Sequence, residues 1–591
     1  MSGDAGAGAG APVRRFRLPW WISLIGGAAV VVLGLLLIVR PFASIGALVV
    51  LIGAAAVLAG VVEAVRAALP GLRVWWRVVL AVLLLATGVL VLAWPGLTIR
   101  MLVTIVGIAL LAVGAVGLVR SVWSGGSPVS PGTRVAEALN GVTGVVLGVV
   151  ALTWPDVTVL AVGVIFGAWL IYAGVRIAIL AVLARPGRRP RERASRRRHE
   201  WPKVVGALLG CLATIAVALV GLRLSGSPVP DAFYAVPGRV PDQPGQLIRA
   251  EPFTNAIPDD ARAWRILYTT TREDGVPAVA SGLVMVPNGV ADPPTIAWTH
   301  GTTGAAVGCA PSLAPEPFTV GAMPDWREAL ARGWAIVATD YVGLGVDPPH
   351  PYVVGQPEAR SALDAVRASR QLDGASFGEQ VVVWGHSQGG HAALWTGGLA
   401  AEYAPELDIV GVAAMAPASN LPALVGSFAN SEIGTVIGPL VIEGYAGAYP
   451  DVRVEDYVIP QARILVEEIA SRCWSEPSMV VGLVEAGLID RPIWSRDPGT
   501  GPLAARAEQN VPRLPIAAPL LIAQGLADPL ILPTSQQDYV DSLCAAGQQV
   551  DYRTYPGKDH MGVVTGDSPL LGELLDWTQD RLDGRPPLDT C

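Results

Sequence analysis

Two kinds of hydrophobic pattern divide this chain of 591 residues. Before about residue 225, apolar residues form seven continuous runs, each long enough to cross a bilayer as a helix. After that point, short strand-like runs and helix-like stretches are separated by polar and Gly/Pro-rich segments, which is typical of a globular domain. The long runs lie near 20–39, 43–65, 75–94, 98–119, 136–154, 158–183 and 203–223.

Six of the seven runs form an internal repeat of three two-helix units, each centred on a proline. Pro41, Pro95 and Pro155 end one run and begin the next. Each proline has a glycine seven residues before it and two more, twelve and nineteen residues after it. The glycines twelve and nineteen residues after the proline lie on one helix face, where small residues let membrane helices approach closely. In chain order these glycines are Gly34, Gly53, Gly60, Gly88, Gly107, Gly114, Gly148, Gly167 and Gly174.

This repeat resembles the HdeD-like short-repeat membrane family, a resemblance that implies no particular molecular activity. Few ionisable residues fall in the middle of the spans, which favours an anchor or packing module over an ion or proton pathway.

The arginines predict the orientation of these spans. They cluster in alternate loops, which the positive-inside rule places in the cytoplasm, whereas the opposite turns carry only Arg40 and Arg100. With an odd number of spans, everything after the seventh emerges outside. The basic loop at 186–201 could bind nucleic acid. Its position beside membrane spans instead favours a role in setting the topology and in contacting anionic lipid. The cytoplasmic arginines are Arg14, Arg15, Arg17, Arg66, Arg73, Arg77, Arg120, Arg134, Arg185, Arg188, Arg189, Arg191, Arg193, Arg196, Arg197 and Arg198.

The second part of the chain contains a strand–turn–helix motif around Ser387. An apolar run at 381–384 precedes Gly385-His386-Ser387-Gln388-Gly389, and a helix-like stretch at 390–395 follows. This arrangement is the nucleophile elbow of an α/β-hydrolase. The flanking positions must be nearly free of side chains, so that the serine oxygen stands clear of the sheet. The pentapeptide alone is a weak signal in a glycine-rich chain, so its context decides.

Chain order supplies that context, because α/β-hydrolases arrange their triad as Ser, then Asp or Glu, then His. Of the six histidines, only His560 follows the elbow, just after a strand-like run at 549–555. Between them, 519–529 reads as a buried strand that ends in a Gly turn and Asp528. We therefore predict a catalytic triad of Ser387, Asp528 and His560.

The same reasoning predicts the groups that stabilise a tetrahedral oxyanion. One donor should be the backbone N–H of Gln388, the residue after the nucleophile. The other should come from the loop after the third strand, which we place at 295–299. Thr302 is our choice in that loop, with Thr303 as the alternative, whereas His300 is expected to brace the loop rather than to act as a second base.

A family resemblance covers roughly 240–591. Five segments together resemble the secretory lipase family of fungi and actinobacteria: 309–312, 338–345, 350–352, 363–368 and 385–391. The resemblance implies an α/β-hydrolase with a helical lid inserted before the strand that carries the acid. It also implies action on acylglycerols or other carboxylic esters.

The cysteines agree with a domain outside the cytoplasm. Cys211 lies within the seventh run, and the other four lie beyond it. An even set in an oxidising compartment suggests two disulfides, with three possible pairings, although free buried thiols remain the alternative. The family resemblance favours the pairs Cys309–Cys473 and Cys544–Cys591. No cysteine–histidine spacing suggests a metal site, and the sequence indicates no cofactor.

The segment from 421 to about 512 has no clean strand alternation and contains helix-like pieces and Gly/Pro breaks, so we expect a cap there. Its apolar residues either form a groove for an acyl chain or, for any single residue, pack into the core of the cap. The net charge is −7, and most arginines lie on the cytoplasmic side, so the outer domain is acidic. This acidity argues against a nucleic-acid partner.

The fold class expected is an N-terminal multi-span α-helical membrane domain, with seven predicted spans, followed by an α/β-hydrolase domain with a helical cap insertion. The expected segments are a cytoplasmic tail (1–19), the six-span repeat domain (20–185), the Arg-rich loop (186–201), a seventh transmembrane helix (202–224), a linker (225–247) and the hydrolase domain (248–591) with its cap at 421–512.

The function expected is that of a membrane-anchored extracytoplasmic serine hydrolase, most simply a lipase or carboxylesterase whose partners are a lipid or small ester substrate and the membrane. Two other classes stay open. One is a peptidase or acyltransferase that uses the same triad, and the other is a non-enzymatic adhesion or sensor domain on a hydrolase fold. Protein partners and the role of the repeat domain are not readable from the sequence.

Overall fold

A computed structural model describes residues 20–39, 53–54, 56–65, 67, 75–93, 95–123, 130–154, 167–168, 170–179, 181–182, 201–224, 227–488 and 492–591. The chain forms two compact units, Met1–Ile215 and Ala216–Cys591.

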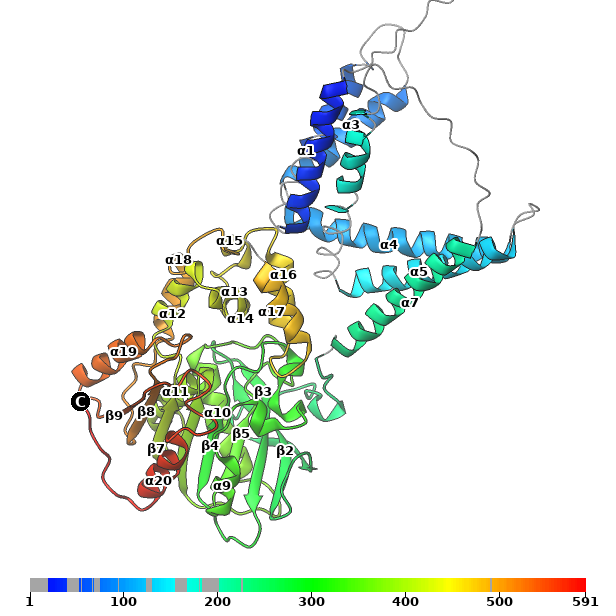
Figure 1. Cartoon of the computed structure of the whole chain (residues 1–591). Helices are drawn as coiled ribbons and strands as arrows, with labels where there is room; N and C mark the ends of the chain where they lie inside the picture. The colour runs from blue at the N-terminus through cyan, green and yellow to red at the C-terminus, as the bar shows by residue number, and fades with distance from the viewer. Residues whose placement is uncertain are drawn as a thin grey trace, which may run out of the picture. The chain divides into compact units, whose positions relative to one another are not determined.

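The C-terminal unit is built on a nine-stranded sheet with the order β1-β2-β3-β5-β4-β6-β7-β8-β9 (Figure 1). The first strands pair in an antiparallel manner, and all pairs from β5 and β4 to β9 are parallel. Parallel strands need crossover connections, which here are mostly helices on both faces. The strands are β1 (Leu247–Phe253), β2 (Ala261–Thr271), β3 (Pro277–Pro287), β4 (Thr295–Thr299), β5 (Ala335–Thr339), β6 (Gln380–His386), β7 (Asp408–Met415), β8 (Leu520–Gly525) and β9 (Asp551–Tyr555).

The strand-like runs of the sequence become β4, β6, β8 and β9. Strand β4 was predicted as the third strand of the domain, but it is the fourth in chain order, because β1, β2 and β3 all precede it. Residues of β4, β6 and β8 are almost entirely buried, which explains why their sequences are continuous apolar runs rather than alternating ones.

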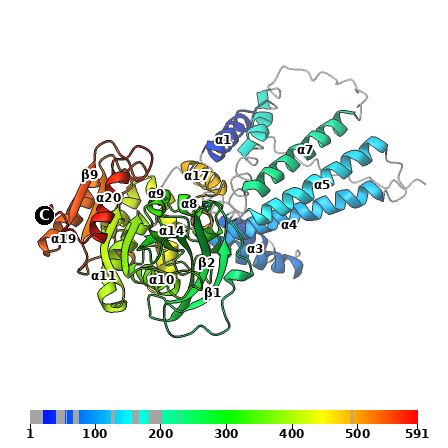
Figure 2. The same ribbon diagram turned by 90° about the horizontal axis from the view of Figure 1, so that it is seen from below.

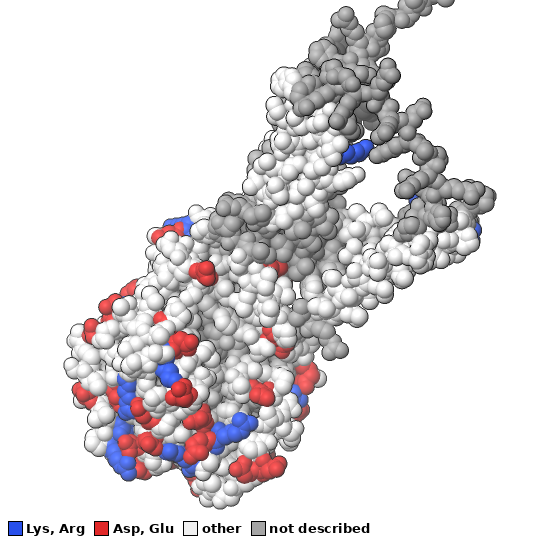
Figure 3. Space-filling model, in the orientation of Figure 1, with Lys and Arg blue, Asp and Glu red and all other residues white. Residues whose placement is uncertain are grey.

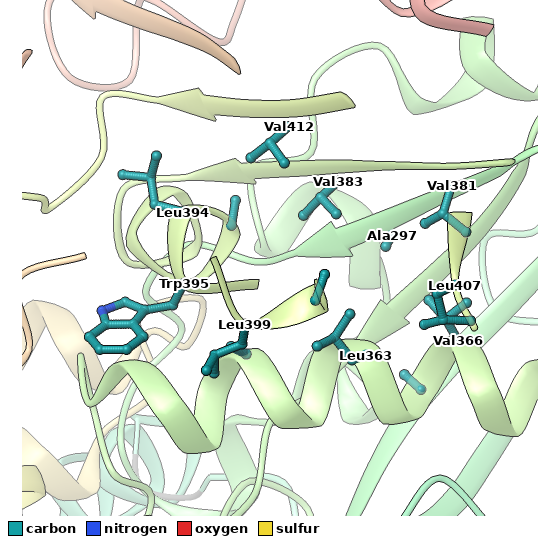
Figure 4. Close-up of a cluster of buried hydrophobic side chains, with 14 of the residues drawn as sticks. Ala297, Leu363, Val366, Val381, Val383, Leu394, Trp395, Leu399, Leu407 and Val412 are labelled. Atoms are coloured by element: carbon teal, nitrogen blue, oxygen red, sulfur yellow. The ribbon is translucent and has the colours of Figure 1, made fainter. Parts of the chain in front are cut away.

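Each face of the sheet has its own apolar core. On one face, Leu363 of α10 (Gly355–Ser369) and Leu394 of α11 (Gln388–Tyr403) pack with Val381 and Val383 of β6 (Figure 4). Residues of α19 (Pro533–Ala545) belong to the same core. Helices α8 (Pro317–Val320), α9 (Trp326–Ala331) and α20 (Leu570–Leu582) contribute to the core on the other face.

Between β7 and β8, the chain forms a set of helices where the sequence predicts a cap. They have their own apolar core, which includes Leu421, Phe428 and Leu440. A cavity of about 570 Å³ also opens among these helices and is lined in part by Phe428, Val436 and Leu483. The helices are α12 (Leu421–Ser427), α13 (Ile433–Val436), α14 (Gly438–Ala448), α15 (Val454–Tyr457), α16 (Arg463–Ser471), α17 (Ser478–Leu488) and α18 (Gly501–Gln509).

The N-terminal part is helical. Its helices are α1 (Trp20–Val39), α3 (Trp75–Ala93), α4 (Pro95–Val122), α5 (Pro131–Thr153) and α7 (Trp201–Leu224), with further apolar helical stretches at Ala56–Val65 and Leu170–Ile179. Within the described residues, two stretches are long and apolar enough to cross a membrane, Thr104–Val122 and Pro131–Thr153. The other five predicted spans correspond to shorter apolar helices, and three of these spans, 43–65, 75–94 and 158–183, include residues outside the described ones.

The repeat glycines lie where these helices meet. A Cβ placed on Gly88 would stand 2.8 Å from Gly53 O, one on Gly148 would stand 2.9 Å from Gly107 O, and one on Gly34 would stand 2.6 Å from Gly167 O. In every case a glycine seven residues before a proline meets a glycine twelve residues after another proline. The helix after one proline therefore packs against the helix before the next, and α4 and α5 show this pairing side by side in both views (Figures 1 and 2).

The third of these pairs closes the set. Gly34 belongs to the first repeat and Gly167 to the last, and a second contact, between Gly27 and Gly174, joins the same two repeats. Within the described residues, each of the three repeats thus contacts both of the others, so the repeats are connected as a ring rather than as an open row. The predicted orientation rests mainly on arginines outside the described residues, although Arg77, Arg120 and Arg134 lie within them.

Candidate active site

Ser387 occupies the sharp turn between β6 and α11. Its backbone has φ 58° and ψ −118°, a conformation that residues other than glycine rarely adopt. A Cβ on Gly385 would stand 2.0 Å from Gly389 O, and one on Gly389 would stand 2.0 Å from Thr299 O. Both flanking positions therefore require glycine, as the elbow motif predicts.

The structure brings the three predicted triad residues together. His560 Nε2 lies 2.9 Å from Ser387 Oγ, and His560 Nδ1 lies 2.8 Å from Asp528 Oδ2. Because a carboxylate only accepts hydrogen bonds, the Nδ1 atom carries the proton and Nε2 is left to accept from the serine hydroxyl. This is the arrangement in which an imidazole can remove the serine proton.

Asp528 is held by four hydrogen bonds. Its Oδ1 accepts from the backbone N–H groups of Leu530 at 2.8 Å and Ile531 at 2.9 Å, and its Oδ2 accepts from His560 and, at 3.1 Å, from Gln524 Nε2. Burial acts to raise the pKa of Asp528. The hydrogen bond and charge of His560, together with the two backbone donors, outweigh it and lower the pKa below its usual value. The carboxylate therefore stays ionised at neutral pH.

The loop after β4, where the second oxyanion donor is predicted, runs beside the elbow. A Cβ on Gly301 would lie 3.3 Å from His386 O. His300 is buried, with its ring nitrogens near Gly301 O at 2.7 Å and Asp340 O at 3.3 Å, so it braces the loop. The Thr302 hydroxyl lies 2.7 Å from Tyr352 OH, while Thr303 is buried.

The first oxyanion donor is predicted to be the backbone N–H of Gln388. As the first residue of α11, Gln388 has no partner for this N–H within the helix. The choice between Thr302 and Thr303 for the second donor stays a prediction.

Beneath the elbow lies a buried polar network that the sequence reasoning missed. Gln388 Nε2 donates to Glu358 Oε1 at 2.7 Å and to His350 Nε2 at 2.9 Å. Glu358 also accepts from Val353 N–H at 3.0 Å, and its second oxygen lies 3.2 Å from His391 Nδ1. Burial raises the pKa of Glu358. The network fixes the side chain of the residue whose N–H is the predicted oxyanion donor.

Two further buried groups hold the site in place. His386 Nε2–H donates to His560 O at 2.9 Å, and burial lowers the pKa of His386 to about 3, so this ring stays neutral. Asp340 accepts from Ser281 Oγ at 2.6 Å and from both the N–H, at 2.9 Å, and the hydroxyl of Ser312. Burial raises the pKa of Asp340 to about 6. Both residues belong to segments that the sequence had singled out, but without a role.

The structure contains two disulfides, Cys309–Cys473 and Cys544–Cys591, and Cys211 is free and buried in α7. The first disulfide joins the segment after the predicted oxyanion loop to the cap. The second joins α19 to the last residue of the chain.

A serine elbow at the carboxyl end of a central parallel strand, backed by a histidine and an acid from later strands, defines the α/β-hydrolase class. A solved structure of this class, Candida antarctica lipase A, is similar in fold, with a TM-score of 0.53 and 22% identity. The similarity covers 62% of this chain and 89% of that one.

Within this class, residues 326–590 match the family model described as secretory lipase. Residues 25–93, 79–133 and 139–220 match the short repeat of unknown function (DUF308), which is the HdeD-like membrane family. The second part of the chain thus matches the secretory lipase model and the first part matches the short-repeat model, so both resemblances noted in the sequence are confirmed.

Two curated proteins illustrate the range of relatives. A secreted triacylglycerol lipase of Malassezia globosa is 27% identical over 64% of this chain and 87% of its own length. A protein of Mycobacterium tuberculosis named a probable inactive lipase is 26% identical over 61% of this chain and 84% of its own length. Relatives of this kind support a lipase or esterase domain.

Proposed function

We propose that this protein is a membrane-anchored, extracytoplasmic serine hydrolase that cleaves lipid esters through an acyl-enzyme. The observation that carries the proposal is the continuous hydrogen-bonded series from Ser387 through His560 to Asp528. In the first half of the reaction, His560 removes the serine proton while Ser387 Oγ attacks the ester carbonyl. His560 then gives that proton to the departing alcohol.

The remaining groups stabilise the charges that develop during the reaction. The ionised Asp528 keeps His560 in the required tautomer and stabilises the imidazolium that forms during attack. The N–H of Gln388 and a donor from the loop with Thr302 and Thr303 would hold the oxyanion, each worth roughly 3 kcal/mol of the barrier. In the second half, a water takes the place of the alcohol and attacks the acyl carbonyl while His560 removes its proton. His560 then returns this proton to Ser387 Oγ as the bond between that oxygen and the acyl carbon breaks, and the carboxylic acid is released.

The lipid-ester assignment draws on the relatives. Secreted triacylglycerol lipases of Malassezia globosa and the secretory lipase family both point to esters of fatty acids. The relative named as probably inactive makes the state of the triad decisive here. All three residues are in hydrogen-bonding contact in this chain, which supports an active enzyme over a non-enzymatic adhesion or sensor domain.

Membrane anchoring and the outward orientation form the second half of the proposal. The DUF308 matches and the apolar helices Thr104–Val122 and Pro131–Thr153 support the anchor. The pairing of four cysteines supports an oxidising compartment for the hydrolase domain.

The decisive experiment compares the wild type with Ser387→Ala on p-nitrophenyl esters of graded chain length, beside peptide anilides. We expect the wild type to hydrolyse the esters and to react with a fluorophosphonate probe, and the variant to do neither while it keeps its thermal stability. Preference for the anilides would assign a peptidase instead. Undiminished labelling of the variant would rule out Ser387 as the nucleophile.

Orientation has its own test. Protease added to intact cells should release a fragment of about 350 residues that retains esterase activity. The triad residues and both predicted oxyanion donors lie within this fragment. Digestion that requires cell lysis would place the hydrolase domain in the cytoplasm and reject this half of the proposal.

A further inference from the structure

Helix α17 of the cap buries its one charged residue and exposes several large apolar residues. Its acidic residue, Glu485, is 1% exposed and lies 3.3 Å from Arg472, which is itself buried. Val480, Leu483 and Val484, in contrast, are 60%, 50% and 56% exposed. These three positions are spaced by three and four residues, so they form one continuous face of the helix. A water-facing helix normally shows the reverse arrangement.

The chain that leaves α7 is attached to the hydrolase unit close to this helix. Ser227 Oγ donates to Ser471 O, at the end of α16, at a distance of 3.1 Å. The next residue is in close contact with the segment after the predicted oxyanion loop, because a Cβ on Gly308 would stand 2.3 Å from Pro228 O. Only two residues separate Ser227 from Leu224, where α7 ends. Three peptide steps span at most about 10 Å, so the end of α16 stays near the carboxyl end of α7.

The turn between α16 and α17 is also fastened to the candidate active site. Trp474 N–H donates to Thr303 O at 2.9 Å, and Cys473 forms the disulfide with Cys309. Trp474 is 36% exposed, and aromatic residues of this kind are enriched at membrane–water interfaces. The segment that follows α7, the predicted oxyanion loop and helix α17 are therefore all attached at the turn between α16 and α17.

We propose that the exposed face of α17, formed by Val480, Leu483 and Val484, docks on the lipid bilayer in which this same chain is anchored. The proposal rests on the membrane anchoring proposed above. It deepens the proposed function, because a domain held in this way draws its substrate from lipid esters of its own membrane. The occupant is the bilayer because the short tether keeps this face near the membrane. An apolar face without charges also suits the interfacial region of lipid.

Docking can be measured on the full-length protein in liposomes of phosphatidylcholine and phosphatidylglycerol. A single environment-sensitive fluorophore is attached at Val484→Cys in a Cys211→Ala background, which removes the free native thiol. We expect a blue-shifted emission and strong quenching by lipids that carry a nitroxide near the headgroup. A blue shift without quenching would mean that protein covers the face, either a second copy or another part of this chain, and would overturn the proposal. Emission typical of water would overturn it as well.

The matched control is Val290→Cys in the same background. Val290 is a partly exposed valine in the loop between β3 and β4, at the amino end of β4. That end of the sheet lies opposite the carboxyl ends, which carry the elbow. The fluorophore at Val290 should report water and escape quenching.

A second measurement separates docking from catalysis. Val480→Asp and Val484→Asp should each lower the hydrolysis of a fluorogenic ester embedded in the liposomes by about tenfold, whereas Val290→Asp should not. All three variants should hydrolyse a water-soluble short-chain ester at the wild-type rate. An equal loss on both esters would indicate a catalytic or folding defect and would overturn the docking role. If the wild type hydrolysed neither ester, the proposed function would fail, while the quenching result would still decide whether α17 docks.

Discussion

The two units of this chain differ in the kinds of residue that they bury. In the hydrolase unit, charged and polar side chains such as Glu358, Asp340 and Asp528 lie inside and are enclosed by hydrogen bonds. In the N-terminal unit, the repeat glycines lie directly against the backbone and apolar side chains of neighbouring helices. Figure 3 shows the same contrast at the surface. Red and blue residues are spread over the hydrolase unit, and the described N-terminal surface in view is almost free of them.

This difference determines how each unit should respond to substitution. In the hydrolase unit, a change of hydrogen-bonding capacity or charge at constant size should matter most, because a buried polar group without its partner is costly. In the N-terminal unit, a change of size at constant polarity should matter most, because there is no room beside the repeat glycines. Four substitutions test this contrast.

Asp528→Asn should have the largest effect. The amide has nearly the same size, but it no longer fixes the required tautomer of His560, so kcat should fall by about four orders of magnitude. Esterase kinetics on the full-length protein measure the loss. Asp559→Asn is the matched control, because Asp559 is exposed and accepts from Gly562 N–H rather than from His560. A larger loss for the control would transfer the acid role to Asp559.

Glu358→Gln should come next. It preserves size but removes one of the two carboxylate acceptors that hold Val353 N–H, Gln388 and His391, and so loosens the residue with the predicted oxyanion N–H. We expect kcat to fall about a hundredfold with little change in KM, as for the loss of an interaction made only in the transition state. A rise in KM at constant kcat would instead assign Glu358 to substrate binding.

Gly114→Val tests the other side of the comparison. A Cβ at Gly114 would stand 2.6 Å from Val145 N and 2.7 Å from Gly141 O. We expect roughly 1–3 kcal/mol of destabilisation, seen as a lower melting temperature of the full-length protein in detergent. Turnover of a soluble ester should not change. Gly210→Val in α7 is the control, since nothing lies within 4 Å of its Cβ position. Equal losses at both glycines would reject the packing role.

The smallest effect is expected for Asp340→Asn, in the pH dependence of stability. The folded-state pKa of Asp340, about 6, lies above the unfolded value, so its contribution to stability is greatest at low pH and is lost as the pH rises through about 6. Asparagine cannot titrate. Between about pH 4 and pH 7 the wild type should therefore lose stability relative to the variant, by on the order of 1 kcal/mol. Denaturant unfolding at both pH values measures this, and parallel curves would contradict the assignment.

The sequence predicted the features that depend on local geometry. The elbow could be recognised because two glycines are required within five residues, and Asp528 and His560 followed from the fixed order of strands in this class. The spacing of the glycines likewise showed which helix faces carry small residues. The buried network around Glu358 could not be predicted, because its members come from distant segments and nothing local distinguishes a buried glutamate from an exposed one.

The same limit applies to the helices of the N-terminal unit. Periodicity shows which residues share a face, but it does not show which helix that face meets, so the contact between Gly34 and Gly167 emerged only from the structure. The seven predicted spans likewise rest on composition. Composition does not determine where each helix begins and ends, or which of its ends faces the cytoplasm.

The contact between Gly34 and Gly167 also has a consequence for chain connectivity. In an open solenoid each repeat touches only its neighbours, and the two outermost repeats need special caps. A ring has no outermost repeat, so each of the three can keep the same glycine positions, as they do here. Its spatial order is cyclic and has no natural beginning. The polypeptide could therefore enter between any two repeats without changing which helices pack together.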